Sequence, residues 1–249
     1  MMLPGALGSA ELGFQLIDWW APRMKIVTPY YIAGRSIAGT QTVLERILDA
    51  EGIDKTSVLG SSSGGTLAQS WTRAHPERTE RMVLSHTIAP DPRYQRRMAL
   101  MTLFMRMLPL RAGKAMMRRK VDKILPQSFE ARDFWNDFFI ELTDDLTKFY
   151  LVNILRCMGE FIGSELTADD LDGWEGETLI LESDNDTSVK EEERAAVRAL
   201  YPSARVHTFQ GSGHASAIVD AHRYAEIVAE FLSGRFATTR TPALERVSG

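Results

Sequence analysis

The residues of this chain that could do chemistry begin with a serine held between two glycines. Gly60, Ser62 and Gly64 form the pattern G-x-S-x-G. Residues 56–59 before it predict a short strand, and residues 66–74 after it predict a helix. A serine at a sharp turn from strand to helix projects its hydroxyl away from the sheet, and the glycines let neighbouring backbone pass close to it. Ser62 is therefore the candidate nucleophile.

A serine nucleophile needs a base that accepts its proton and an acid that holds the base. Residues 178–183 predict a buried strand that runs into a polar turn containing Asp184 and Asp186. Residues 204–209 predict another strand, which is followed by the glycine-flanked His214. His214 is therefore the candidate base, and either carboxylate can be the acid.

The order of these residues along the chain, with the acid and the base each following a late strand, resembles the α/β-hydrolase superfamily. The resemblance implies an α/β fold: a mostly parallel sheet flanked by helices, with an inserted helical cap. In that family a valine lies three residues after the catalytic aspartate, which selects Asp186 ahead of Val189 and leaves Asp184 in reserve. The serine nucleophile argues against branches that use an aspartate, such as epoxide hydrolases.

The resemblance also implies an oxyanion hole made of backbone amides. One donor is the N–H of Ser63, and the other is the N–H of Ala6 or Leu7, beyond Gly5. One such donor contributes about 3 kcal/mol to lowering the barrier. The family usually has His-Gly in this loop where the chain has Pro4-Gly5, a tolerable change because the hole needs amides rather than an imidazole.

The amino-terminal segment carries a finer resemblance and a departure from the family. Residues 3–11 and 25–30 resemble the maspardin-type subgroup of α/β-hydrolases. The oxyanion loop begins by residue 5, so only residues 1–4 remain for the strand before it, and the N-terminal strands that normally precede this point are expected to be missing. This indicates either a start assigned too far downstream or a truncated relative. Residues 25–28 predict a further strand.

Two core segments and one insertion are expected. Residues 1–87 and 177–249 carry the strand signals and form the α/β-hydrolase core, whereas residues 88–176 are mainly helical in pattern and form the cap that roofs the active site. His86 follows a strand on the ligand-binding edge of the sheet, and it is either a substrate contact or a structural hydrogen-bond partner. The cap methionines either line a substrate pocket or pack the cap onto the core; the candidates are Met98, Met101 and Met105.

Charge limits the classes of partner. The net charge of -4 and pI near 5.8 give no reason to expect nucleic acid. No apolar run approaches the length of about 18 residues that a spanning helix requires, so stable membrane insertion is not expected. Residues 93–123 are strongly basic and residues 130–177 acidic, so the two halves either pair with each other or the basic half contacts a membrane surface. A second copy of the chain is a candidate partner.

The single cysteine, Cys157, allows no intramolecular disulfide, which favours a cytoplasmic location. No cluster of metal ligands appears in the sequence, and no metal or other cofactor is expected. The combined prediction is a serine hydrolase that cleaves a carboxylic ester, or a related acyl bond, of a small to medium apolar substrate. The alternative is a non-catalytic module of the same fold that binds ligands or proteins, as the maspardin resemblance allows, or a truncated inactive relative.

Overall fold

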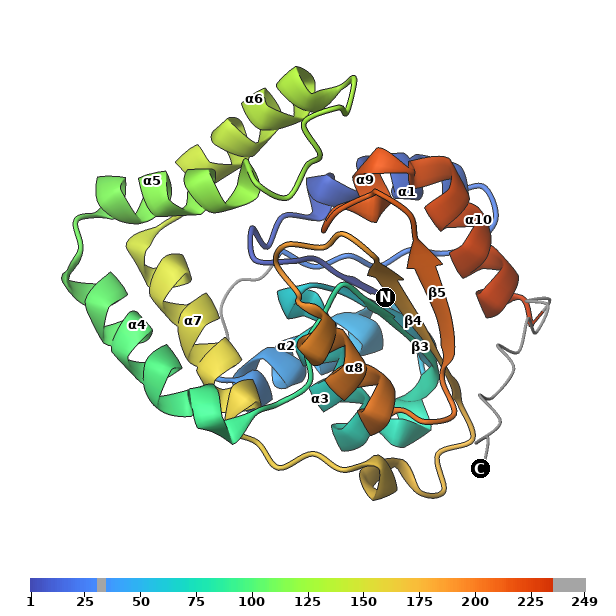
Figure 1. The fold of residues 1–249 in the computed structure, drawn as a ribbon. Coiled ribbons are helices and arrows are strands. Elements are labelled where there is room, and N and C mark those ends of the chain that lie inside the picture. The colour runs from blue at the N-terminus through green and yellow to red at the C-terminus, as the bar shows by residue number, and fades with distance from the viewer. Residues whose placement is uncertain (31–34, 235–249) are drawn as a thin grey trace, which may run out of the picture.

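A five-stranded parallel sheet forms the centre of the computed structural model, which describes residues 1–30 and 35–234 (Figure 1). The strands cross the sheet in chain order, and every neighbouring pair is parallel. They are β1 (Met2–Leu3), β2 (Thr56–Ser61), β3 (Thr79–Ser85), β4 (Glu177–Ser183) and β5 (Arg205–Phe209). Residues 235–249, the end of the expected second core segment, lie outside the described residues.

Helices cover both faces of the sheet because side chains alternate along each strand. In β3, Met82 and Leu84 point to one face and Val83 to the other, and all three are fully buried. The first face packs against α2 (Ile37–Ala50), α3 (Ser63–Ala74) and α8 (Glu191–Leu200). The second face packs against α1 (Phe14–Trp20) and α10 (Ala221–Leu232). This arrangement confirms the predicted α/β architecture.

The strand β1 lies at one edge of the described sheet, where it pairs with β2. The ammonium group of Met1 donates a 2.7 Å hydrogen bond to the Ser57 carbonyl oxygen. The prediction of a strand at residues 25–28 is wrong. Among the described residues, one backbone hydrogen bond reaches this segment, from the N–H of Met2 to the Val27 carbonyl oxygen at 2.8 Å, and one such bond does not make a ladder.

The segment between β3 and β4 is mainly helical, and we call its four α-helices the helical insertion (Figure 1). They are α4 (Gln95–Met107), α5 (Leu110–Val121), α6 (Arg132–Asp144) and α7 (Lys148–Ile162). The helices α5, α6 and α7 share a hydrophobic cluster with Leu7 and Ala215, which belong to the loops after β1 and β5. The insertion therefore packs against the loops at the carboxyl ends of the strands. Within the described residues, no helix has the length and apolarity needed to cross a bilayer.

Candidate active site

Ser62 occupies the turn between β2 and α3 in a backbone conformation that is rare for any residue but glycine. Its φ is 52° and its ψ is −118°. A Cβ atom on Gly60 would overlap the Gly64 carbonyl oxygen, and one on Gly64 would overlap the Leu3 carbonyl oxygen. Both glycines of the motif are thus required by close backbone packing. Such strain persists only where the surroundings enforce it, and it commonly marks a functional turn.

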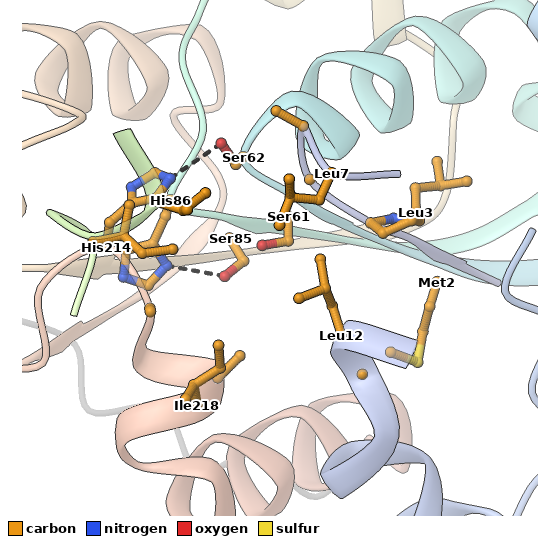
Figure 2. Close-up of a pocket in the computed structure, with 18 of the residues that line it drawn as sticks. Met2, Leu3, Leu7, Leu12, Ser61, Ser62, Ser85, His86, His214 and Ile218 are labelled. Carbon is orange, nitrogen blue, oxygen red and sulfur yellow. Dashed lines mark hydrogen bonds between the residues drawn. The ribbon is translucent and has the colours of Figure 1, made fainter. Parts of the chain in front are cut away.

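The structure brings Ser62 and His214 together with Asp186. The Nε2 atom of His214 lies 3.1 Å from the Ser62 hydroxyl oxygen, a contact drawn as a dashed line in Figure 2. Its Nδ1 atom lies 2.8 Å from a carboxylate oxygen of Asp186. The other carboxylate oxygen of Asp186 accepts the backbone N–H of Ser188 and of Val189. The contact with histidine thus falls to Asp186.

Asp184, the reserve acid, has a different contact. One of its carboxylate oxygens accepts the backbone N–H of Gly211 at 2.8 Å. Gly211 and Gly213 both have positive φ, 73° and 63°, which lets the loop after β5 turn and present His214. Asp184 therefore holds the histidine loop by its backbone, whereas Asp186 contacts the imidazole itself.

The charge state of Asp186 fixes the proton positions on His214. Burial alone would raise the pKa of the Asp186 carboxyl, but the hydrogen bonds from His214 and from the Val189 N–H help to offset burial, and that pKa lies below its ordinary value. An ionised carboxylate can only accept hydrogen bonds, so the Nδ1 atom of His214 carries the proton. The Nε2 atom is then free to accept the hydroxyl proton of Ser62.

The backbone around Ala6 forms a tight turn beside the nucleophile. The N–H of Gly8 bonds to the Gly5 carbonyl oxygen at 2.9 Å, and a Cβ atom on Gly5 would lie 3.5 Å from the Cβ of Ser62. Among the described residues, the N–H groups of Ala6, Leu7 and Ser63 have no hydrogen-bond acceptor. An oxyanion hole needs two such amide donors near the nucleophile, which Ser63 and either Ala6 or Leu7 can supply.

His86 is buried beside the histidine of this group. Its ring nitrogens lie 3.0 Å from the Ser85 hydroxyl and 2.9 Å from the Ser183 hydroxyl, and its ring meets the His214 ring edge to face at 5.7 Å between centroids (Figure 2). Burial, with the nearby His214, lowers the pKa of His86 to about 3. His86 is therefore neutral, in a left-handed backbone conformation with φ of 49°.

A largely apolar cavity of about 150 Å³ opens beside Ser62, His86 and His214. Figure 2 shows the histidines at one side, with Ile218 below them, and the apolar side chains of Met2, Leu3, Leu7 and Leu12 at the other side. From the helical insertion, α5 contributes Met117, Lys120 and Val121. The cavity can hold an apolar group next to the serine hydroxyl.

The three predicted cap methionines do not line this cavity. Met98 packs against Phe161 and Ile162 of α7, and Met105 packs among the other helices of the insertion. Met101 is half-buried on the same helix. Of the predicted substrate contacts, only His86 lies in the cavity wall. The sequence analysis missed Tyr150, whose hydroxyl donates a hydrogen bond to the Ala6 carbonyl oxygen. The residues around Tyr150 in the sequence do not indicate this distant contact.

The chain is similar to known hydrolases and matches one family model. A family model described as alpha/beta hydrolase fold matches residues 33–221. A 2-hydroxymuconate semialdehyde hydrolase of Pseudomonas putida is 28% identical over 210 residues, which is 75% of this chain and 66% of that protein. Esterase YbfF of Escherichia coli (strain K12) is 25% identical over 167 residues, 67% of this chain and 63% of that protein. The chain thus covers just under two thirds of the length of either relative.

Solved structures agree with the fold. A thermophilic esterase from Thermogutta terrifontis superposes with a TM-score of 0.77 at 16% identity, covering 95% of this chain and 89% of that one. The resemblance to the maspardin-type subgroup stays a prediction. Since the family model spans most of the chain and the sheet and its flanking helices agree with it, the chain belongs to the alpha/beta hydrolase fold family.

Proposed function

We propose that this protein is a serine hydrolase that cleaves a carboxylic ester, or a related acyl bond, by way of an acyl-enzyme. The observation that carries the proposal is the hydrogen-bonded series from the Ser62 hydroxyl through His214 to Asp186. The esterase and hydrolase names of the relatives support the same reaction class.

The first half of the reaction forms the acyl-enzyme. His214 Nε2 accepts the Ser62 hydroxyl proton while Ser62 Oγ attacks the substrate carbonyl carbon. The N–H groups of Ala6 and Ser63 stabilise the negative charge on the former carbonyl oxygen. His214 then gives the proton to the leaving alcohol oxygen, and the bond between the acyl carbon and that oxygen breaks. Asp186 stays ionised and stabilises the imidazolium.

Water completes the reaction by the same route. His214 removes a proton from water as the water oxygen attacks the acyl carbon. When the bond between the acyl carbon and Ser62 Oγ breaks, His214 returns that proton to Ser62 Oγ and the carboxylic acid leaves. The cavity favours an apolar acyl or alcohol group of small to medium size, because its wall opposite the polar groups is aliphatic. Thioesters, lactones and C–C bonds of β-diketones fit the same chemistry less directly.

A non-catalytic binding module is the competing function. Such a module needs a cavity but has no use for an imidazole held between a carboxylate and a strained serine. The positive φ of Ser62 and its contact with His214 therefore favour the hydrolase.

Labelling with a fluorophosphonate probe tests the proposal. We expect a single adduct on the full chain, located by mass spectrometry at Ser62 and absent from Ser62→Ala. The variant Ser61→Ala is the matched control, because Ser61 also lines the cavity but has no contact with His214 in the described structure, and it should label normally. Folded protein that does not label, or that labels equally with Ser62→Ala, contradicts the hydrolase and supports the binding module.

A further inference from the structure

The outer face of α4 is apolar and uncovered. Leu100 is 67% exposed and Met107 79% exposed, and Leu103 and Phe104 between them are more than half exposed. Their spacing of three and four residues places all four on one face of the helix. The opposite face, with Met98 and Met105, packs against the rest of the helical insertion. A surface helix normally buries its apolar face and exposes a polar one. The apolar side chains on the exposed face of α4 therefore indicate an interaction site.

Basic residues surround this face. Between residues 93 and 120 the chain has nine lysines and arginines and no acidic residue, although its net charge is -4. Arg96 and Arg97 lie at one end of α4, Arg106 lies at its other end, and Arg111 lies at the start of α5; all four are exposed. Among the described residues, no carboxylate pairs with any of these four. Among the described residues, two ion pairs join the basic and acidic halves of the insertion, Arg118 with Asp144 and Arg132 with Asp122, and neither involves these four arginines.

We propose that α4 and the start of α5 dock on an anionic phospholipid surface. Leu100, Leu103, Phe104 and Met107 would enter the boundary between headgroups and acyl chains, and the flanking arginines would bind lipid phosphates. The cation-rich rim around an apolar face matches the negative charge and apolar interior of such a surface. The protein would lie on the membrane rather than span it, consistent with the lengths of its described helices.

A second copy of the chain fits this face less well. A two-fold interface places the same patch on both subunits, so the arginines of one copy would face those of the other. Like charges facing each other across an interface are unfavourable. An anionic lipid surface has no such conflict, which is why we choose it over self-association.

The position of this face also relates it to the cavity. The helix α5, which follows α4 along the same side of the molecule in Figure 1, contributes Met117, Lys120 and Val121 to the cavity wall. Membrane docking would therefore hold the insertion next to the source of apolar substrates. The proposal does not depend on the hydrolase activity, because its test measures binding alone.

Co-sedimentation of the full chain with vesicles tests the proposal. We expect binding to vesicles of phosphatidylcholine with 30 mol% phosphatidylglycerol (about one anionic lipid in three), little binding to pure phosphatidylcholine, and weaker binding as salt rises, since the attraction of basic segments to anionic lipid is screened. Absence of binding to the anionic vesicles, or equal binding to both kinds, overturns the proposal.

Paired variants locate the binding surface. The double variant Arg96→Glu/Arg97→Glu should bind at least tenfold more weakly, because each basic residue near the surface contributes about fivefold. Leu103→Gln/Phe104→Gln should also weaken binding at least fivefold. The control Arg46→Glu/Lys55→Glu makes the same change in net charge at exposed positions on α2 and before β2, and should bind within twofold of wild type. Equal loss in the control overturns the proposal, as does a dimer in solution that the Leu103→Gln/Phe104→Gln variant disrupts.

Discussion

The hydroxyl of Tyr150 on α7 donates a 3.0 Å hydrogen bond to the carbonyl oxygen of Ala6, although 144 residues separate the two in sequence. A Cβ atom on Gly8 would overlap the Tyr150 hydroxyl, so the ring reaches the loop only because residue 8 is glycine. Gly8 also has a positive φ of 65°. The helical insertion thereby holds the loop that presents the proposed oxyanion donor.

Tyr150→Phe should lower kcat about tenfold and leave KM nearly unchanged. The substitution removes one hydrogen bond, of about 1 to 1.5 kcal/mol, from the loop that carries the proposed oxyanion donor. Because that donor would act on the transition state rather than on bound substrate, the loss of stabilisation should appear in kcat. Steady-state kinetics on a short-chain ester measure both constants.

Tyr201→Phe is the control for this prediction. Tyr201 also uses its hydroxyl, which contacts Arg73 and Gln69 away from the site. A loss of kcat in the control equal to that in Tyr150→Phe, or a rise in KM alone for Tyr150→Phe, contradicts the positioning role.

Asp186→Asn should lower kcat by about 10⁴, because the amide reverses the hydrogen bond that fixes the tautomer of His214. Asp184→Asn should stay within about threefold of wild type, since its amide oxygen can still accept the Gly211 N–H. Single-turnover rates on the same ester compare the two. Near-normal activity of Asp186→Asn with loss in Asp184→Asn would assign the acid to Asp184.

Local sequence patterns predict the serine turn and the histidine loop, because each is formed by a few consecutive residues. The serine stands between two glycines and the histidine directly follows a glycine, each after a strand, and such loops are visible over a few residues. The choice of Asp186 over Asp184 came from the family resemblance, because both carboxylates share one turn. The structure brings that residue to His214.

Features that depend on distant packing were not predicted from sequence. A methionine on the inward face of a helix looks the same whether it faces a substrate or another helix, so Met98 and Met105 could not be separated from packing residues. The strand predicted at residues 25–28 has suitable side chains, but pairing depends on a neighbour whose backbone bonds to it repeatedly, and the described structure provides one backbone hydrogen bond, from Met2.

The buried His86 should make the protein less stable in mild acid. Its pKa is about 3 in the folded state and near 6.5 when unfolded, so below pH 6.5 the unfolded chain takes up a proton that the folded chain does not. The free energy of unfolding should therefore fall by up to about 1.4 kcal/mol per pH unit from this group as pH drops from 6.5 towards 3. Asp186 adds to the loss only below about pH 4.

His86→Asn isolates this contribution. Asparagine tolerates the left-handed backbone at this position and does not titrate. Denaturant unfolding at pH 7, 6, 5 and 4 should give a shallower decline for the variant than for wild type. Parallel declines would mean that His86 is not held neutral in the folded protein.

Gly64→Ala should destabilise the protein by about 3 kcal/mol or more, although alanine is about 1 kcal/mol better than glycine within a helix. Gly64 lies in the first turn of α3, and a Cβ atom there would overlap the backbone carbonyl oxygen of Leu3, which cannot move without disturbing β1.

Gly52→Ala is the comparison. Residue 52 has a positive φ of 64° but no atom within 4 Å of an added Cβ, so only backbone strain of about 1 to 2 kcal/mol applies. Denaturant unfolding of both variants separates the two causes. A Gly64→Ala protein as stable as Gly52→Ala would show that β1 can move away from the nucleophile turn.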